Sequence, residues 1–448
     1  MARILIANTP FIGHISPVLP IARALVGRGH DVRWYTGALF RERVEATGAR
    51  FVPMVHAPPI GEAADEQQAA EDARRGPVER LKHDLKHAFG DSMPGQMQDL
   101  EALHQTWQPD VVLADSTFFG ISLYHERYGV PYATIGIVPL PISSRDTAPF
   151  GLGILPIGSP LGRLRNGILN WAVEKLIFAD VQRHLQEVRA RAGFGPMRDF
   201  FLNGLSPYLY LQATVPSFEY PRSDLSPTVH FIGPVIGAPP RDYPRPAWWG
   251  ELESGRPVVH VTQGTVATEA AQLIVPTIQA LAEEDLLLVV TTGGQPVESI
   301  PLARLPENVR VESFIPHPLL LPHVDAMITN GGYGGVQTAL AHGVPLVVAG
   351  ASEDKPEVAN RVQWAGVGLN LRTATPRPEQ IRRAVKSILS NRRFAEQAGV
   401  LQREYARYSA PQMAAALLEK LAATGQPVQR EAAAPASALH LAPEQLGS

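Results

Sequence analysis

Short runs of β-branched and apolar residues alternate with helical patterns along most of this chain. In the first half, strands are expected at residues 3–7, 32–35, 111–114, 133–138 and 208–212. In the second half, they are expected at 258–262, 286–291, 309–314, 326–329 and 346–349. This alternation is typical of parallel sheets covered by helices on both faces. The predicted fold class is therefore α/β, with doubly wound, Rossmann-like sheets.

A chain of 448 residues is too long for one ordinary core, so two domains are expected. The proline-rich stretch 216–249 is predicted to link an N-terminal domain (1–215) to a C-terminal domain (250–423) that ends in closing helices. The Ala-, Pro- and Gln-rich tail, 424–448, is predicted to be disordered. Because α/β sheets bind ligands at the carboxyl ends of their strands, the ligand is expected in the cleft between the domains.

Composition and charge exclude several classes of function. The net charge of -3 is spread without blocks, which argues against nucleic acid or an anionic membrane surface as a partner. The absence of cysteine excludes disulfides, thiolate catalysis and Cys-ligated zinc. The first apolar run is too short for a signal-peptide core, and no run approaches the roughly 18 apolar residues of a membrane span. A cytoplasmic protein without stable membrane insertion is expected.

The most informative motif is a glycine turn in the second half. After the expected strand 326–329 come Gly331, Gly332, Gly334 and Gly335, and then a helical pattern. Glycines let backbone N–H groups approach a ligand closely, and the helix N-terminus behind them carries partial positive charge. A second strand, 346–349, leads into the acidic pair Glu353-Asp354. The sequence therefore predicts a nucleotide-diphosphate site in the second domain.

Two residues of the first half are candidates for catalysis. His14 follows the first strand, so its imidazole is expected at the carboxyl edge of the sheet, where it can accept a proton near neutral pH. Asp115 ends the strand 111–114 and can orient a histidine and stabilise its protonated form. The alternatives are a packing histidine and a helix N-cap. Asp110 lies at the opposite edge of the sheet and is a weaker candidate.

Two further patterns carry less information. Gly264 and Thr265 follow the first strand of the second domain and could touch a phosphate, as many strand-to-helix turns could. His83 and His87 have the i, i+4 spacing of metal ligands, but no third ligand accompanies them in sequence, which favours a solvated helix face. No metal site is predicted.

Together these motifs resemble the family 1 inverting glycosyltransferases of the GT-B fold, especially the bacterial macrolide-type enzymes. The resemblance spans nearly all of 1–423 and is most specific at Gly13-His14-x-x-Pro17 and at 314–361. It implies that an acceptor hydroxyl displaces the nucleoside diphosphate at the anomeric carbon of the sugar, with inversion and without a metal. His14 would be the general base and Asp115 its orienting carboxylate.

The resemblance also assigns the donor site. Phe314 lies where the family has an aromatic ring stacked on the nucleobase, and Asp354 matches the acidic residue that holds the sugar hydroxyls. The residues expected to bind the nucleotide sugar are Gly13, Gly264, Thr265, Phe314, Ile315, His317, Asn330, Gly331, Gly332, Gly334, Gly335, Thr338, Glu353, Asp354 and Lys355.

Four of these positions depart from the family pattern. Asn330 stands where the family usually has His, although its amide can still donate to a phosphate oxygen. Gly335 replaces a Ser or Thr that touches the diphosphate, and Thr338 replaces a Glu that grips the ribose in plant relatives. Lys355 replaces a Gln, and it can reach a sugar hydroxyl or pair with a neighbouring carboxylate. The reaction class stands, but the donor stays open.

The acceptor site is expected in loops of the N-terminal domain, including the Pro- and Gly-rich segment 139–162. Its candidates are the apolar residues Phe11, Ile12, Phe118, Phe119, Pro141 and Phe150, each of which could equally belong to the core. They indicate a small lipophilic acceptor.

The predicted function is transfer of a hexose, glucose first, from a UDP-sugar or a dTDP-sugar to a hydroxyl of a natural-product or phenolic acceptor. No cofactor is expected, and the protein is expected to be a monomer or a weak dimer. Three alternatives remain: a sugar-nucleotide epimerase of the same fold, a non-catalytic auxiliary partner, and, more distantly, a dehydrogenase, although the first turn lacks Gly-x-Gly-x-x-Gly.

Overall fold

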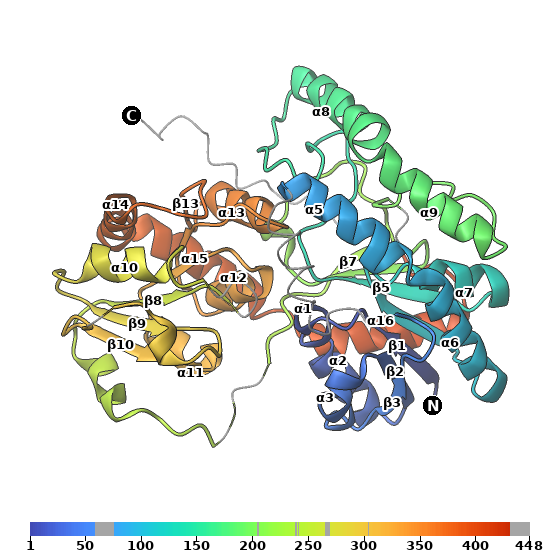
Figure 1. The fold of residues 1–448 in the computed structure, drawn as a ribbon, viewed down its shortest axis with the longest axis horizontal. Helices are drawn as coiled ribbons and strands as arrows, with labels where there is room; N and C mark the ends of the chain where they lie inside the picture. The colour runs from blue at the N-terminus through green and yellow to red at the C-terminus, as the bar shows by residue number, and fades with distance from the viewer. Residues whose placement is uncertain are drawn as a thin grey trace.

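The computed structural model describes residues 1–58, 76–203, 206–237, 240, 242–264, 269–302 and 304–430. Two parallel sheets lie side by side, each with helices on both faces (Figure 1). The predicted fold class, α/β with two doubly wound sheets, is therefore confirmed.

The N-terminal sheet has seven strands, all paired in parallel. In sheet order they are β3 (Arg50–Pro53), β2 (Asp31–Thr36), β1 (Arg3–Ala7), β4 (Val111–Asp115), β5 (Tyr132–Gly136), β6 (Leu209–Gln212) and β7 (Val229–Phe231). Its helices are α1 (Ile12–Ile15), α2 (Leu19–Gly27), α3 (Arg41–Glu45), α5 (Pro77–His83), α6 (Met93–Thr106), α7 (Gly120–Tyr128), α8 (Pro160–Ala172) and α9 (Ala179–Arg191). Two π-helical segments, η2 (Asp84–Gly90) and η3 (Val173–Ile177), continue α5 and α8.

The C-terminal sheet has six parallel strands. In sheet order they are β10 (Val309–Glu312), β9 (Leu287–Thr291), β8 (Val258–Thr262), β11 (Ala326–Thr329), β12 (Leu346–Val348) and β13 (Gly368–Asn370). Its helices are α10 (Ile274–Leu281), α11 (His317–Leu320), α12 (Tyr333–Ala341), α13 (Lys355–Trp364), α14 (Pro378–Ser390) and α15 (Arg392–Tyr405). Short 3-10 turns lie at Ala38–Phe40, Pro216–Phe218, Ala247–Glu253, Val297–Ser299 and Leu321–His323.

All ten expected strands are present, with ends shifted by at most two residues. The strands β3, β7 and β13 are not among these ten. Each has only three or four residues and lies at the edge of a sheet, so few of their side chains must be buried and their sequences show no clear period. The expected helical segment 61–105 is present from residue 77 onward, and its first part lies outside the described residues.

The last helix, α16 (Ala410–Thr424), differs from the prediction that all closing helices belong to the C-terminal domain. Its residues Ala414, Leu418 and Leu421 are buried in the core beneath the N-terminal sheet, together with Ile4 and Leu25. The chain therefore crosses back to the N-terminal domain. Beyond it, Val428 is buried and bonds to Tyr208, so the predicted disorder does not begin at 424; residues 431–448 lie outside the described residues.

The segment predicted as the linker also takes part in the N-terminal domain. Its strand β7 pairs with β6, and Glu219 is fully enclosed between the two domains. The turn Ala247–Glu253 precedes β8, the first strand of the C-terminal domain.

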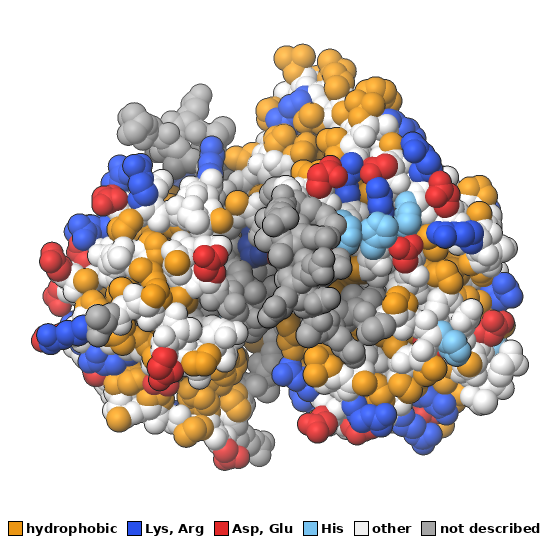
Figure 2. Space-filling model, viewed as in Figure 1, with side chains coloured by type: hydrophobic (Ala, Val, Ile, Leu, Met, Phe, Trp, Pro, Cys, Tyr) orange, Lys and Arg blue, Asp and Glu red, His pale blue; other side chains and the backbone are white. Residues whose placement is uncertain are grey.

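Helix α8, which follows the long loop after β5, lies at the top of the N-terminal lobe in Figure 1. Helix α8 presents apolar side chains to the surface, which Figure 2 shows as a patch at the top of this lobe: Leu161, Leu164, Ile168 and Trp171. Within the described residues, no helix combines the length and the apolar composition that crossing a bilayer requires.

Candidate active site

His14 lies on the one-turn helix α1, directly beyond the carboxyl end of β1. Its side chain is 18% exposed, and its Nδ1 atom lies 3.3 Å from Oδ1 of Asp115. A Cβ atom on the neighbouring Gly13 would meet no other atom within 4 Å, so a ligand can approach the backbone there. The structure thus brings together the histidine and the carboxylate that the sequence singled out.

Asp115 is buried at the end of β4 and accepts hydrogen bonds from several directions. The backbone N–H of Thr9 donates to Oδ2 at 2.6 Å, and the backbone N–H of Thr117 donates to Oδ1 at 2.8 Å. Burial raises the pKa of the Asp115 carboxyl, but the charge of His14 and these hydrogen bonds outweigh it and hold the pKa below its ordinary value. Asp115 is therefore a carboxylate at neutral pH.

Thr117, which the sequence analysis did not single out, fixes the orientation of His14. Its hydroxyl lies 2.7 Å from Oδ1 of Asp115 and 3.2 Å from Nδ1 of His14. A carboxylate only accepts, so the Thr117 hydroxyl donates to Asp115 and the His14 Nδ1 atom must donate to the hydroxyl or to the carboxylate. The opposite nitrogen, Nε2, then keeps its lone pair, as a general base requires.

The glycine turn lies at the carboxyl end of β11. Gly331 has φ of 92°, and a Cβ atom there would lie 2.8 Å from a methyl of Val348, so only glycine fits. Gly332 precedes α12 with φ of -58°, and no side chain caps the helix. A Cβ atom on Gly332 would approach nothing closer than 3.9 Å, and one on Gly334 would meet no atom within 4 Å. Uncapped N–H groups therefore face open space at the start of a nine-residue helix, which suits an anion.

Asn330 ties this turn to the neighbouring one. Its amide nitrogen donates to the carbonyl of Gln263, and its amide oxygen accepts from Gly332 N–H at 3.3 Å. Gly264 follows Gln263 with φ of 76°. One N–H of the Asn330 amide is thus used within the protein, and the other can still donate to a ligand. Thr265 lies outside the described residues.

Hydrogen bonds between the domains place this turn near the carboxyl edge of the N-terminal sheet, where His14 lies. Residues Asp115, Gly136 and Gln212 end the neighbouring strands β4, β5 and β6. The Gln212 amide donates at 3.0 Å to the hydroxyl of Tyr333, the first residue of α12. Figure 1 shows α1 and α12 at the border between the two lobes. The His14 edge and the glycine turn therefore belong to one inter-domain region.

Comparison with known proteins agrees with this geometry. The chain is 50% identical to 4'-demethylrebeccamycin synthase of Lentzea aerocolonigenes over 422 residues, which covers 94% of this chain and 99% of that protein. It is 34% identical to UDP-glycosyltransferase 2 of Phaeomoniella chlamydospora, covering 94% and 96% of the two chains. The chain belongs to the family 1 glycosyltransferases.

Two further comparisons support the assignment. Residues 276–421 of this glycosyltransferase match the family model described as "Erythromycin biosynthesis protein CIII-like, C-terminal domain". Its fold superposes on the glycotransferase of kitacinnamycin with a TM-score of 0.73 and 25% identity, covering 94% and 98% of the two chains.

The acidic corner of the glycosyltransferase lies between β12 and α13. Burial raises the pKa of the Asp354 carboxyl to about 6, with Lys355 opposing this and Glu353 adding to it. Lys355 is buried, and its ammonium donates to Glu353 and, at 3.2 Å, to Ser352. Of the two roles open to Lys355, the structure shows pairing with a neighbouring carboxylate, and Asp354 remains the candidate for a sugar hydroxyl.

The segment expected near the nucleobase is divided between surface and core. Phe314 is 56% exposed, as a stacking platform requires, whereas Ile315 is 1% exposed and packs in the core, so its side chain cannot reach a ligand.

The His317 ring lies beside Gly335, and burial, together with nearby His342, lowers the pKa of His317 to about 4. A neutral His317 therefore adds no charge. The Thr338 hydroxyl donates back to the Gly334 carbonyl at 2.8 Å, within its own helix.

The residues predicted to bind the acceptor also differ in their exposure to solvent. Phe118 is enclosed in the core against Tyr35, and Pro141 is buried, so both predictions are wrong for these side chains. Phe11 and Phe119 are partly exposed; Ile12 packs on the core, and Phe150 is partly buried in the loop before α8. The Phe11 ring centroid lies 5.7 Å from that of His14 and 6.2 Å from that of Phe89, an unexpected residue of η2.

From Phe89 the aromatic contacts continue into the N-terminal domain. The Phe89 ring contacts Phe119 at 6.4 Å, and the Phe119 ring contacts Phe201 at 6.3 Å, both edge to face. The row therefore runs from His14 to the core. Sequence reasoning missed Phe89 because it lies in a segment that reads as a polar helix.

The loop after β5 is hydrogen-bonded to the C-terminal domain. The Gly151 and Gly153 N–H groups donate to Oε1 of Glu357 at 3.0 and 2.8 Å, and Asn360 donates to the Gly153 carbonyl. Glu357 and Asn360 both lie on α13, which begins at Lys355, directly after Asp354. The loop from the N-terminal domain thus reaches the helix that follows the acidic corner.

Proposed function

We propose that this glycosyltransferase moves a hexose from a nucleoside-diphosphate sugar to a hydroxyl of a natural-product acceptor, with inversion at the anomeric carbon and His14 as the general base. The observation that carries the proposal is the arrangement of His14. Its Nδ1 atom is engaged by Thr117 and Asp115, which leaves Nε2 to accept a proton.

The proposed reaction is a single displacement. The acceptor oxygen attacks the anomeric carbon as its proton passes to Nε2 of His14. The bond from that carbon to the diphosphate oxygen breaks, and its electron pair leaves with the diphosphate. Attack from the face opposite the leaving group inverts the configuration. Asp115 stabilises the imidazolium that forms, as an orienting carboxylate does in a catalytic dyad.

We propose that the N-terminus of α12 stabilises the departing charge. Negative charge on the diphosphate grows in the transition state, so N–H donors fixed before the reaction lower the barrier. The uncapped start of α12 supplies such donors without a metal ion. We further propose that the sugar hydroxyls bind Asp354 and that the base stacks on Phe314.

UDP-glucose is the first donor to test, and dTDP-glucose the second. The name of the relative UDP-glycosyltransferase 2 supports a UDP-sugar. The aromatic row that begins at Phe11, beside His14, supports an apolar, ring-containing acceptor.

The test is product formation by mass spectrometry with excess EDTA. It would cross UDP-glucose, UDP-galactose, UDP-N-acetylglucosamine and dTDP-glucose with phenolic, indole-type and macrolide acceptors. We expect a hexose adduct whose anomeric configuration, read by NMR, is opposite to that of the donor. Retained configuration would contradict direct displacement, and loss of activity that added Mg²⁺ restores would contradict metal independence.

A further inference from the structure

Three side chains with metal-ligating atoms meet on the outer flank of the N-terminal domain. The Nδ1 atom of His87 lies 2.9 Å from Oδ2 of Asp91, and the Nε2 atom of His184 lies 2.8 Å from Oδ1 of the same carboxylate. The three donor atoms all lie within 4.8 Å of one another. This cluster takes no part in the reaction proposed above.

Two elements distant in sequence supply the cluster. His87 lies in the π-helical segment η2 and Asp91 directly follows it, whereas His184 lies on α9. The sequence pattern of His83 and His87 indicated no metal because it showed no third ligand. The fold gives His87 other neighbours than His83: Asp91 lies beside it, and its ring meets that of His184 edge to face at 5.2 Å.

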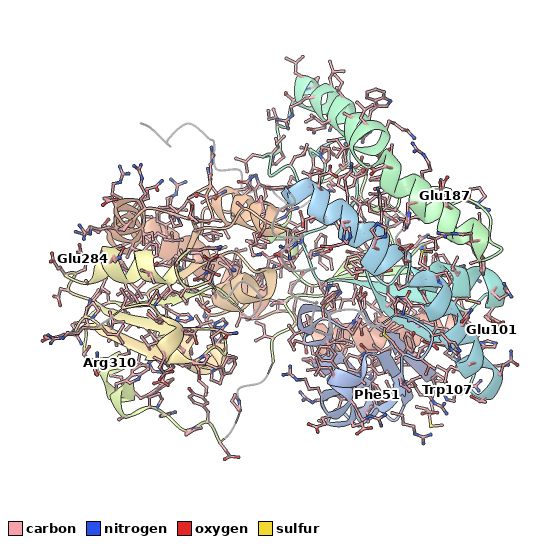
Figure 3. The ribbon with its side chains drawn as sticks, in the orientation of Figure 1. Phe51, Glu101, Trp107, Glu187, Glu284 and Arg310 are labelled. Atoms are coloured by element: carbon pink, nitrogen blue, oxygen red, sulfur yellow. The ribbon has the colours of Figure 1, made fainter. Side chains whose placement is uncertain are left out.

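The cluster is accessible from solvent. The side chains of His87, Asp91 and His184 are 49%, 39% and 21% exposed, and Figure 2 shows histidine side chains gathered on this face. Asp91 and His184 also line a surface pocket of about 630 Å³ that includes Glu101 and Arg127. Figure 3 shows Glu101 on α6 and Glu187 on α9 at the outer end of the lobe, away from the border between the domains.

The charges around the cluster allow a cation to bind. Lys82 and Lys86 are close in sequence, but both ammonium groups pair with Asp180, at 3.2 and 2.5 Å. Two arginines of the pocket, Arg127 and Arg191, remain nearby, and Glu101 lies 3.9 Å from Arg127. The carboxylate of Asp91 supplies one negative charge at the centre of the cluster.

We propose that His87, Asp91 and His184 bind a divalent transition-metal ion, with Zn²⁺ as the best match. Zn²⁺ accepts imidazole nitrogen and carboxylate oxygen at about 2.0–2.2 Å in a tetrahedral site, and water can complete the fourth position. The two nitrogens and the carboxylate oxygens already face one another. Binding requires the tautomers in which His87 carries its proton on Nε2 and His184 carries its proton on Nδ1. The metal then takes the place of the two N–H protons that face Asp91.

The position of the cluster gives the metal a structural role. It would join η2 to α9, and η2 also carries Phe89, whose ring packs on Phe11. A bound metal therefore braces one wall of the region beside His14 without touching the reacting groups. The metal site itself does not depend on the proposed function.

The test is isothermal titration of the untagged, chelator-treated full chain with ZnCl₂. We expect one saturable site per chain and a higher melting temperature with Zn²⁺. Replacing a ligand, in Asp91→Asn or His184→Gln, is expected to weaken Zn²⁺ binding by at least roughly 10-fold, because ligand geometry and charge are both lost. The matched control is His56→Ala, which removes an imidazole 2.7 Å from Asp99. Among the described residues, no second imidazole bonds to Asp99.

Circular dichroism and melting without metal establish that the variants fold. Absence of saturable binding to the wild-type chain would overturn the proposal. So would equal affinity of wild type and both ligand variants, or loss of binding in His56→Ala. These measurements read metal binding directly, so their outcome is independent of whether glycosyl transfer is detected.

Discussion

The side-chain amide of Gln212, at the end of β6, donates a 3.0 Å hydrogen bond to the hydroxyl of Tyr333, the first residue of α12. The bond joins the edge of the N-terminal sheet to the start of the helix proposed to receive the diphosphate. Next to it, Thr214 exchanges a hydrogen bond with Gln337 on the same helix. The position of α12 relative to His14 therefore depends on side chains of both domains.

Removal of the Tyr333 hydroxyl is expected to loosen this joint. Tyr333→Phe should lower the free energy of unfolding by about 0.5–1.5 kcal/mol, the usual net value of one hydrogen bond, and should lower kcat more than it raises the donor KM. Tyr210→Phe is the matched control, because the Tyr210 hydroxyl is buried without a partner among the described residues. Equal destabilisation of the two variants in urea unfolding would assign no role to the inter-domain bond.

Replacement of His14 by alanine tests the general base. His14→Ala should reduce transfer by roughly 10²–10⁴-fold, the range that general-base catalysis supplies, while UDP affinity measured by titration stays the same. Thr117→Val, which keeps the imidazole but removes a partner of Nδ1, should cost less. Full activity in His14→Ala would remove this residue from the mechanism.

Two adjacent glycines should respond differently to substitution. Gly332 has an ordinary φ and open space, so Gly332→Val should leave the melting temperature nearly unchanged and weaken nucleotide binding by filling the proposed diphosphate space. Gly331→Ala should lower the melting temperature, since φ of 92° and the approach to Val348 both exclude a Cβ atom. Unchanged nucleotide affinity in Gly332→Val would place the diphosphate elsewhere.

Asp354 should give the enzyme a pH dependence near pH 6. Its pKa is raised to about 6 in the folded protein, so folding favours the neutral carboxyl. The free energy of unfolding should therefore decrease as pH rises through 6 and the carboxyl loses its proton. Asp354→Asn should therefore raise the free energy of unfolding at pH 7 by about 1–3 kcal/mol.

The same substitution should weaken donor binding. A carboxylate accepts more strongly from sugar hydroxyls than its protonated form, so the wild-type donor KM should fall between pH 5 and 7. In Asp354→Asn the donor KM should be higher and independent of pH over this range. A pH-dependent donor KM that persists in the variant would assign the titration to another group.

Arg361 should be essential for stability. It is buried between Glu219 and Glu357, and burial, which lowers the pKa of its guanidinium, is outweighed by these carboxylates, which raise it. Arg361→Met removes the guanidinium that bonds both carboxylates, so that Glu357 keeps only N–H donors and Glu219 keeps Arg222 at 3.9 Å, and it should cost about 3–5 kcal/mol. The control is Arg310→Met: Arg310, labelled in Figure 3, forms a partly exposed pair with Glu251, whose loss should cost less than about 1 kcal/mol. Similar losses in chemical unfolding would contradict this difference.

The sequence by itself determined the two series of strands, because the apolar runs of β1, β4, β8 and β11 are local and each must be buried on both faces. It also determined the glycine turn, because glycines follow the apolar run of β11 and glycine adopts the positive φ of Gly331, 92°, without strain. His14 and Asp115 could be paired in advance because each follows a strand at the same sheet edge.

Only the tertiary structure decided which side chains meet across long separations. Thr117 reaches His14 over 103 residues, and Arg361 reaches Glu219 over 142. The structure alone also shows that His184 lies beside Asp91 and that α16 packs in the N-terminal core. The period of the apolar residues in α16 fits a helix on either core. Hydrophobic period and turn chemistry are local properties of a chain, whereas the partner of a polar side chain or of a helix face is set by how the sheets pack and where the chain crosses between them.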